Sequence, residues 1–125
     1  MVVRGYVFHL GTLDGRPVVV GRSGTGKVNA SIVATLLIDH FSPSALLFSG
    51  TAGAIDPDLR PGDVVIGQTV AQHDIGQQTP NGITRRGMRN ATTGELDPVL
   101  LPAPELLLAA ARRSARELTL PSVKT

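Results

Sequence analysis

Residues 17–31 read PVVVGRSGTGKVNAS, and this stretch decides the fold class. The three valines predict a strand, the glycine-rich part predicts a turn, and the residues after it begin an apolar periodicity typical of a helix. Between Gly21 and Lys27 the spacing is that of a nucleotide-binding P-loop, G-x-x-x-x-G-K. A P-loop continues with Ser or Thr, because that hydroxyl binds Mg²⁺, whereas Val28 follows here. The sequence therefore predicts a strand–turn–helix unit without the metal ligand of an ATPase.

The same order of elements recurs further along the chain. Residues 45–48, ALLF, form a continuous apolar run, as expected of a strand buried on both faces of a parallel sheet. Residues 49–54, SGTAGA, form a second glycine-rich turn directly after it. Open α/β sheets bind ligands at the carboxyl ends of their strands. Two glycine turns that follow strands therefore predict a small-molecule site at the strand ends.

Further elements are predicted on both sides of these turns. They are a strand over 4–10, a hairpin turn at Asp14-Gly15, helices over 28–41 and 104–118, a strand over 64–70 and the approach to a strand over 120–125. The apolar faces of the helices are predicted to hold Val28, Ile32, Val33, Leu36, Leu37 and Phe41, and Leu106, Leu107, Ala110, Ala111 and Ala115. Residues 71–104 have little periodicity and predict a long loop. This order is that of an α/β protein.

Composition narrows the class of protein. A chain of 125 residues with 42% apolar and 18% charged residues predicts one globular domain at most. The absence of cysteine excludes disulfides, thiol nucleophiles and thiolate zinc sites. No metal site is expected either, because the three histidines are far apart in the sequence. There is no apolar run of the ~20 residues that a membrane span needs, and no signal peptide. We therefore expect a cytoplasmic protein that does not bind a membrane.

Charge gives little indication of a polyanionic partner. The formal net charge is +2 and the arginines are scattered, so we expect no nucleic-acid binding. Arg85, Arg86 and Arg89 form the one cluster, which is read either as a phosphate patch or as a solvated loop.

Several short motifs together resemble the nucleoside phosphorylase/nucleosidase superfamily. They are GTLDG at 11–15, SGTGKVNA at 23–30, GTAGA at 50–54, PGDVV at 61–65 and HD at 73–74. The nearest branch is that of the 5′-methylthioadenosine/S-adenosylhomocysteine nucleosidases. The resemblance implies a three-layer α/β/α fold with a mixed central sheet, incomplete at both ends, so that residues 1–125 are a single partial domain with a long loop over 75–104. It also implies a purine nucleoside substrate, no cofactor and a homodimer in the full-length family.

The resemblance assigns roles to four residues. Thr51 is expected to contact the nucleophile and the ribose, Ala52 and Gly53 to lie against the base, and Thr25 to lie beside the sugar, where the family has an apolar residue. The residue types suit these roles, because Thr51 offers a hydroxyl and small residues let backbone donors approach a flat ligand. The alternative is that both glycine turns are only structural.

The nature of the nucleophile is indicated by Phe48. Phosphorylases of this superfamily carry an arginine at this place, three residues before the Ser/Thr, and it binds the phosphate. An apolar ring cannot replace that bidentate contact, so the sequence favours water. Arg22 or Arg60 could substitute for the arginine, which leaves a phosphorylase as an alternative. A futalosine hydrolase-like enzyme is a further alternative.

The catalytic carboxylates of the nucleosidase branch have no counterpart here. These are a glutamate after the first strand, a second in a Met-Glu motif and an aspartate in a Ser-Asp motif, and Asp63, Asp74 and Glu105 match none of them. Each general acid or base contributes typically about 10²–10⁴-fold to the rate. We therefore expect a fragment with no catalytic residue of its own and little or no activity. The alternative from another class is a non-catalytic remnant or a binding module.

Overall fold

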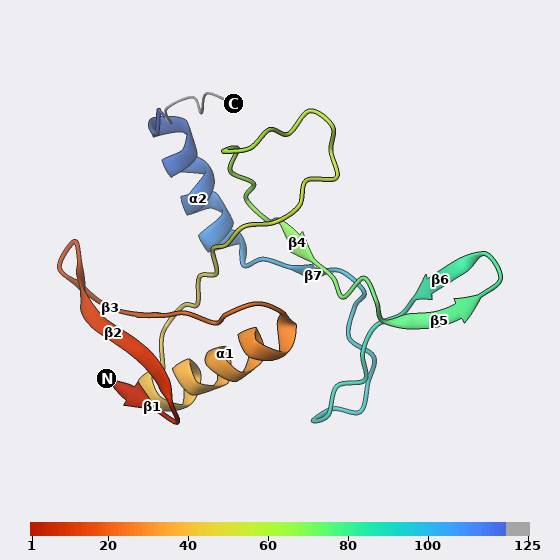
Figure 1. Cartoon of the computed structure of the whole chain (residues 1–125), viewed down its shortest axis with the longest axis horizontal. Helices are drawn as coiled ribbons and strands as arrows, with labels where there is room; N and C mark the ends of the chain where they lie inside the picture. Colours follow the sequence, from red (N-terminus) through yellow and green to blue (C-terminus); the bar gives the residue numbers. More distant parts are fainter. Residues whose placement is uncertain (120–125) are drawn as a thin grey trace. The chain divides into compact units, whose positions relative to one another are not determined.

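The computed structural model describes residues 1–119, so the predicted approach to a strand at 120–125 lies outside the described residues. The chain divides into two compact units, Met1–Ala52 and Gly53–Thr125 (Figure 1). Together they contain helices and strands, as an α/β composition requires. The strands of the described residues are paired in small antiparallel sheets, and this pairing does not confirm the three-layer arrangement that was expected.

The first unit is built on a three-stranded antiparallel sheet. Its strands are β1 (Val2–Val3), β2 (Tyr6–Leu13) and β3 (Arg16–Gly21), in the order β1-β2-β3. Asp14 and Gly15 join β2 to β3 with φ angles of 49° and 74°. Positive φ at both central residues defines the type I′ turn, whose twist matches that of the flanking strands. The hairpin predicted from Asp14-Gly15 is thus confirmed.

A second tight turn, which the sequence pattern did not predict, joins β1 to β2. Arg4 and Gly5 have φ angles of 51° and 88°, so this turn also has two residues with positive φ. The Met1 ammonium group donates to the Phe8 carbonyl at 2.8 Å, and the Phe8 N–H donates to the Met1 carbonyl at 2.8 Å. These bonds extend the pairing of β1 with β2 to the first residue of the chain.

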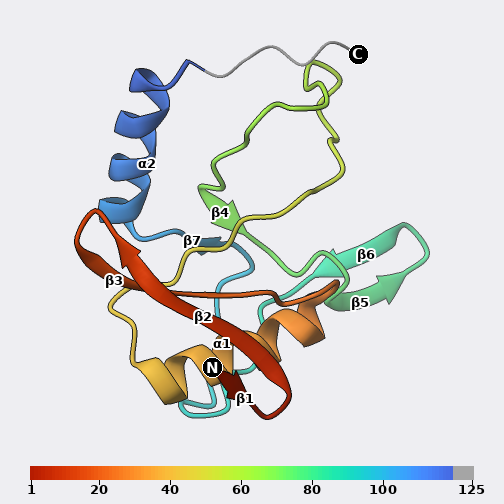
Figure 2. The ribbon, with the colours of Figure 1, turned by 60° about the vertical axis from the view of Figure 1, so that its left-hand side comes forward.

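Helix α1 (Lys27–Phe41) confirms the predicted helix to within one residue. It ends at Ser42, which has a φ of 45° and donates its N–H to the Ile38 carbonyl at 3.1 Å. Pro43 follows and cannot continue the helix. Figure 2 shows α1 lying along one face of the sheet.

The core of the first unit forms between α1 and the sheet. Val3, Phe8 and Val33 are buried, Phe8 to 1% exposure, and the rings of Phe8 and Phe41 lie 5.4 Å apart. Gly21 makes room for Phe8, because a Cβ there would lie 2.8 Å from the ring. Of the predicted helix face, Val33, Leu36, Leu37 and Phe41 pack in this cluster. Val28 and Ile32 are exposed instead, since the packing begins only at Val33.

The predicted strand over 45–48 is wrong for the structure described. These residues have no regular secondary structure, and Leu47 and Phe48 are 82% and 76% exposed. A continuous apolar run is stable as a strand only when neighbouring strands and helices cover both of its faces. No strand among residues 1–119 pairs with this segment.

The described residues of the second unit, 53–119, form two small sheets and one helix. Strand β4 (Thr69–Val70) pairs with β7 (Leu101–Pro102), and β5 (Gly76–Thr79) pairs with β6 (Gly82–Arg85), both antiparallel. The strand predicted over 64–70 is therefore correct only at its last two residues. Residues 64–66 have no regular structure and are exposed, because nothing in this region pairs with them.

The long loop predicted over 71–104 is more structured than its composition indicates. It contains the β5–β6 hairpin, in which the Thr79 hydroxyl donates to the Gly82 carbonyl at 2.7 Å across the turn. Arg89 and Leu96 form a further antiparallel bridge. The strands read GQQT and GITR, so they lack the apolar alternation that identifies a half-buried strand.

Helix α2 (Glu105–Glu117) confirms the second predicted helix, with Pro104 at its N-cap. Its buried residue is Leu108, which was not predicted, whereas Leu106 is exposed. Positions 106 and 108 lie on opposite sides of a helix of 3.6 residues per turn. The side of α2 that is covered by other residues is therefore the side that carries Leu108.

Asp63 is expected to hold its turn through one specific hydrogen bond. Its carboxylate Oδ2 accepts from the Arg60 N–H at 2.8 Å, and its own N–H donates to the Arg60 carbonyl at 3.0 Å. Asp63→Ala removes the acceptor, so hydrogen exchange at the Arg60 amide should become about 10-fold faster. Asp63→Asn keeps a carbonyl acceptor and serves as the control. Equal exchange in the wild type and the alanine variant would show that the bond does not hold the turn.

Candidate functional site

The first glycine turn lies between β3 and α1 and has a local reason for its glycines. Gly24 and Gly26 have φ angles of 73° and 92°, a region that residues with a side chain rarely adopt. The Asn29 side-chain amide donates to the Thr25 carbonyl at 2.8 Å, which links the turn to the first turn of α1. The Thr25 side chain is exposed. The backbone conformation alone therefore explains the glycines at 24 and 26. The Thr25 hydroxyl is nevertheless accessible to a ligand.

The second glycine turn has no comparable local reason at Gly53. A Cβ at Gly53 would meet no heavy atom within 4 Å, and its φ is not positive. At Gly50 a Cβ would lie 3.7 Å from the Phe48 ring, an ordinary van der Waals contact, so packing does not require glycine there either. Thr51, Ala52 and Gly53 are exposed and have no regular secondary structure. Neither backbone conformation nor packing in the described chain therefore requires a small residue at 53.

The four predicted substrate-binding residues are divided between the two units. Thr51 and Ala52 end the first unit, Gly53 begins the second, and no hydrogen bond among residues 1–119 joins Thr25 to Thr51. The turn at 51–53 has functional groups that could contact a ligand, but it does not form an enclosed pocket by itself. It presents one hydroxyl and successive small residues whose backbone donors are accessible.

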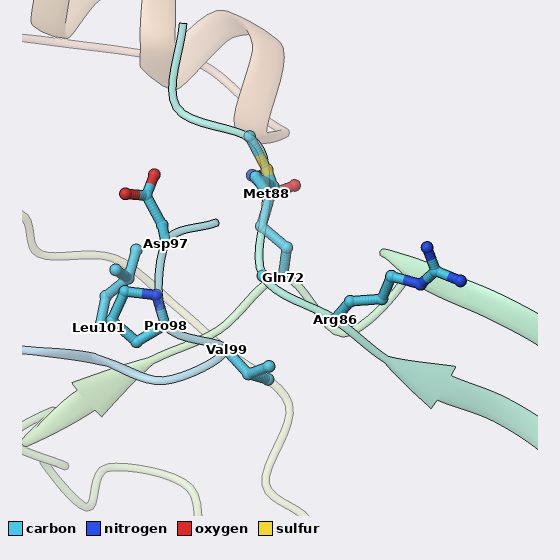
Figure 3. Close-up of a pocket in the computed structure, with 8 residues that line it drawn as sticks. Gln72, Arg86, Met88, Asp97, Pro98, Val99 and Leu101 are labelled. Atoms are coloured by element: carbon cyan, nitrogen blue, oxygen red, sulfur yellow. The ribbon is translucent and has the colours of Figure 1, made fainter. Parts of the chain in front are cut away.

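A cavity that the sequence did not predict lies within the second unit (Figure 3). Its volume is about 80 Å³, and it is lined by Gln72, Arg86, Gly87, Met88, Asp97, Pro98, Val99 and Leu101. Gln72 Nε2 donates to Met88 Sδ at 2.8 Å across it. A Cβ at Gly87 would overlap the Asp97 carbonyl oxygen, so these two chain segments approach closely only because residue 87 is glycine. Ligand pockets are typically about 300–1,000 Å³, so this cavity is too small for a nucleoside.

Two residues of the arginine cluster have local acceptors. The Arg86 Nη2 donates to the Gln77 Oε1 at 2.8 Å, and Figure 3 shows its side chain extending toward the β5–β6 hairpin. Arg89 Nη1 donates to the Gly94 carbonyl. These contacts favour a structural role in the loop for both side chains over a phosphate patch.

Within residues 1–119, no three His, Asp or Glu side chains gather closely enough to hold a metal ion. In the same residues, no helix combines the length and the apolar character needed to cross a membrane.

Known proteins and a family profile match nearly the whole chain. A profile of the phosphorylase superfamily matches residues 2–125. A 5′-methylthioadenosine/S-adenosylhomocysteine nucleosidase from Geobacillus kaustophilus is 39% identical over 117 residues, which are 94% of this chain and 47% of that protein. Proteins of the same name from Psychromonas ingrahamii and Tolumonas auensis are 34% identical over 118 residues and 47% over 73, covering 94% and 58% of this chain and 48% and 32% of theirs.

The chain thus spans less than half the length of each of these three relatives. No solved structure matches it significantly.

Proposed function

We propose, since the chain belongs to the phosphorylase superfamily, that it forms the substrate-binding part of a nucleosidase that cleaves the N-glycosidic bond of a purine nucleoside. The observation that carries the proposal is the similarity to relatives named 5′-methylthioadenosine/S-adenosylhomocysteine nucleosidase, which covers 94% of this chain at 39% identity. A 5′-thioether nucleoside of this type is the substrate that we propose. The protein would work in the cytoplasm without a cofactor.

The second glycine turn would contact the nucleoside. We assign the Thr51 hydroxyl to the ribose and the attacking water, the backbone of Ala52 and Gly53 to the base, and Thr25 to the side of the sugar. The described chain gives no steric or conformational reason for glycine at 53, as it gives none at Gly11 and Gly67, so Gly53 is compatible with a ligand role. A base lying flat on the backbone would supply that reason.

The proposed reaction is hydrolysis. Water attacks the anomeric carbon, the bond from that carbon to the purine nitrogen breaks, and the base leaves after protonation. The carboxylates that activate the water and protonate the base would come from outside these 125 residues. The full protein would have the three-layer α/β/α fold and form a homodimer.

A phosphorylase is the second candidate. Phe48 favours water over phosphate, because its ring offers no donor to a phosphate dianion, whereas arginine binds one bidentately. In a protein that contains these residues and has the full length of its relatives, inorganic phosphate should therefore leave the rate of base release unchanged. Acceleration by phosphate would favour the phosphorylase, whose product would be a ribose 1-phosphate derivative.

The site assignment can be tested in a chimaera that has the full length of one of the relatives. In this chimaera, residues 2–125 of the chain replace the matching region of the Geobacillus kaustophilus nucleosidase. Thr51→Val removes the hydroxyl at nearly constant volume and should lower kcat/KM for adenine release by about 10–100-fold, the value of one hydrogen bond strengthened in the transition state. Thr51→Ser keeps the hydroxyl and should retain most of the activity. Equal rates for the valine variant and the parent chimaera would refute the role of Thr51.

A further inference from the structure

We propose that Asn81, in the turn of the β5–β6 hairpin (Figure 1), is a site of covalent self-modification, at which the side-chain amide is lost and aspartate and isoaspartate are formed. The reaction needs water as its only co-reactant and no enzyme. The proposal stands independently of the proposed function, because its test measures charge and mass rather than release of a base.

The chemistry follows from the residue that comes after Asn81, which is Gly82. The backbone nitrogen of Gly82 attacks the side-chain carbonyl carbon of Asn81, a carbon–nitrogen bond forms, and the bond to the amide nitrogen breaks. Ammonia leaves with the proton that the Gly82 nitrogen loses, and a cyclic succinimide remains. Water then opens this ring on one side to give aspartate, or on the other to give isoaspartate. Glycine favours the attack, because it has no Cβ to hinder the approach and has the widest choice of backbone angles.

The turn leaves the reacting side chain unrestrained. Pro80 and Asn81 form a two-residue loop between Thr79 and Gly82, which are paired in the ladder. Asn81 is exposed, and within residues 1–119 its side chain has no hydrogen-bond partner. A Cβ at Gly82 would meet no heavy atom within 4 Å, so the space beside this residue is open. The Asn81 amide can therefore rotate toward the backbone of the next residue.

Local opening of the hairpin supplies the backbone rotation that ring closure also requires. The strand residues of β5 and β6 are exposed apart from Thr79, so little burial opposes this opening. A two-stranded hairpin is at best marginally stable by its own pairing. The turn is therefore expected to sample the reactive geometry without unfolding of the rest of the chain.

Asn29 provides a contrast within the same protein. It lies in α1, and its Nδ2 donates to the Thr25 carbonyl at 2.8 Å. The nitrogen that would attack belongs to Ala30, and it donates to the Gly26 carbonyl at 3.1 Å. Both reacting groups are thus engaged, and the Ala30 Cβ adds a steric obstacle that glycine lacks.

Asn90 is held in a different way. Its Oδ1 accepts from the N–H groups of Thr92 and Thr93 at 2.9 and 3.2 Å. Its Nδ2 donates to Asp97 Oδ1 at 3.3 Å, and the next residue is Ala91 rather than glycine. Of the three asparagines in the sequence, all within the described residues 1–119, only the one in the hairpin combines a following glycine with an unbonded side chain.

Modification would change the hairpin in charge and in backbone length. Either product carries a carboxylate that is ionised at neutral pH, so the formal net charge falls by one from +2. Isoaspartate also adds a carbon to the backbone of the loop between Thr79 and Gly82. The Thr79 hydroxyl donates to the Gly82 carbonyl at 2.7 Å across this loop. The pairing of β5 with β6 should therefore be disrupted in the isoaspartyl form.

Incubation of the 125-residue chain in a mildly alkaline buffer tests the proposal. A more acidic form should accumulate on isoelectric focusing, and peptide mapping by mass spectrometry should place the change at residue 81. The rate at Asn81 should exceed those at Asn29 and Asn90 at least about 10-fold, which corresponds to about 1.4 kcal/mol in the barrier. Asn81→Gln would have to close a larger ring, so the acidic form should not accumulate. Asn29→Gln is the matched control and should leave its accumulation unchanged.

A second incubation in urea separates the effect of the structure from that of the dipeptide. Unfolding removes the hydrogen bonds of Asn29 and Asn90, so their rates should rise, while the rate at Asn81 should change little. Equal rates at the three asparagines in buffer would overturn the proposal. A rise at Asn81 of about 10-fold or more in urea would also overturn it, because the hairpin would then be protecting the residue. Unchanged rates at Asn29 and Asn90 in urea would overturn the protection assigned to their hydrogen bonds.

Discussion

The 125-residue chain by itself is expected to release adenine from 5′-methylthioadenosine at least about 10⁴-fold more slowly than the chimaera of relative length. Two or more absent acid–base groups account for a factor of this size, since each contributes typically about 10²–10⁴-fold. The exposure of Thr51, Ala52 and Gly53 acts in the same direction, because water is not excluded from the turn. The measurement is adenine release by protein purified from a host without its own nucleosidase.

Calorimetric titration with a 5′-methylthio transition-state analogue separates binding from catalysis. Tight binding by the chimaera and weak or no binding by the isolated chain would agree with an unformed site. Turnover by the isolated chain at a rate near that of the chimaera would contradict the assignment of the carboxylates to another segment. A folded but inactive chimaera would refute the proposed function.

Substitution of Phe8 should unfold the first unit. Phe8 is the residue with the lowest exposure in its core, 1%, and its ring packs 5.4 Å from that of Phe41. Phe8→Ala leaves a cavity in a cluster whose other buried side chains, among the described residues, are Val3 and Val33. Truncations of this kind cost about 3–5 kcal/mol, which is comparable to the whole stability of a small domain. Circular dichroism during heating should show loss of the cooperative transition.

The neighbouring Val7 provides the control for this prediction. Val7 is exposed on the other side of β2, so Val7→Ala should change the free energy of unfolding by no more than about 0.5 kcal/mol. Phe8→Leu, which keeps most of the apolar volume, should give an intermediate loss. Unchanged melting of Phe8→Ala would show that the cluster around Phe8 does not hold the unit together.

The elements that the sequence predicted correctly are those fixed by local interactions. Asp14-Gly15 favours a type I′ turn by its own backbone preferences, and α1 ends at Ser42 because Pro43 follows. The strands over 45–48 and 64–70 depend instead on partners distant in the sequence. Their apolar pattern predicted burial, whereas in the described chain residues 46–48 and 64–66 are exposed and unpaired.

Other errors arose where side-chain patterns were ambiguous. The β5–β6 strands, GQQT and GITR, contain one large apolar residue, Ile83, and so lack an alternating signal. In α2 the run of three leucines allowed two apolar faces, and packing selected that of Leu108. For the site, residue types indicated a hydroxyl and a small-residue turn at 51–53. Their geometry could not be predicted, because it depends on whether the preceding strand is formed.

The uncharged stretch from 42 to 55 also bears on the fate of the chain in a cell. A polypeptide that exposes an apolar segment with no charge to protect it is bound by chaperones, cleaved by proteases or lost to aggregation unless a partner covers that segment quickly. Synthesis alone would then not determine how much of the chain accumulates. Its abundance would depend on whether residues 45–48 become covered, and chains in which they stay exposed would be short-lived.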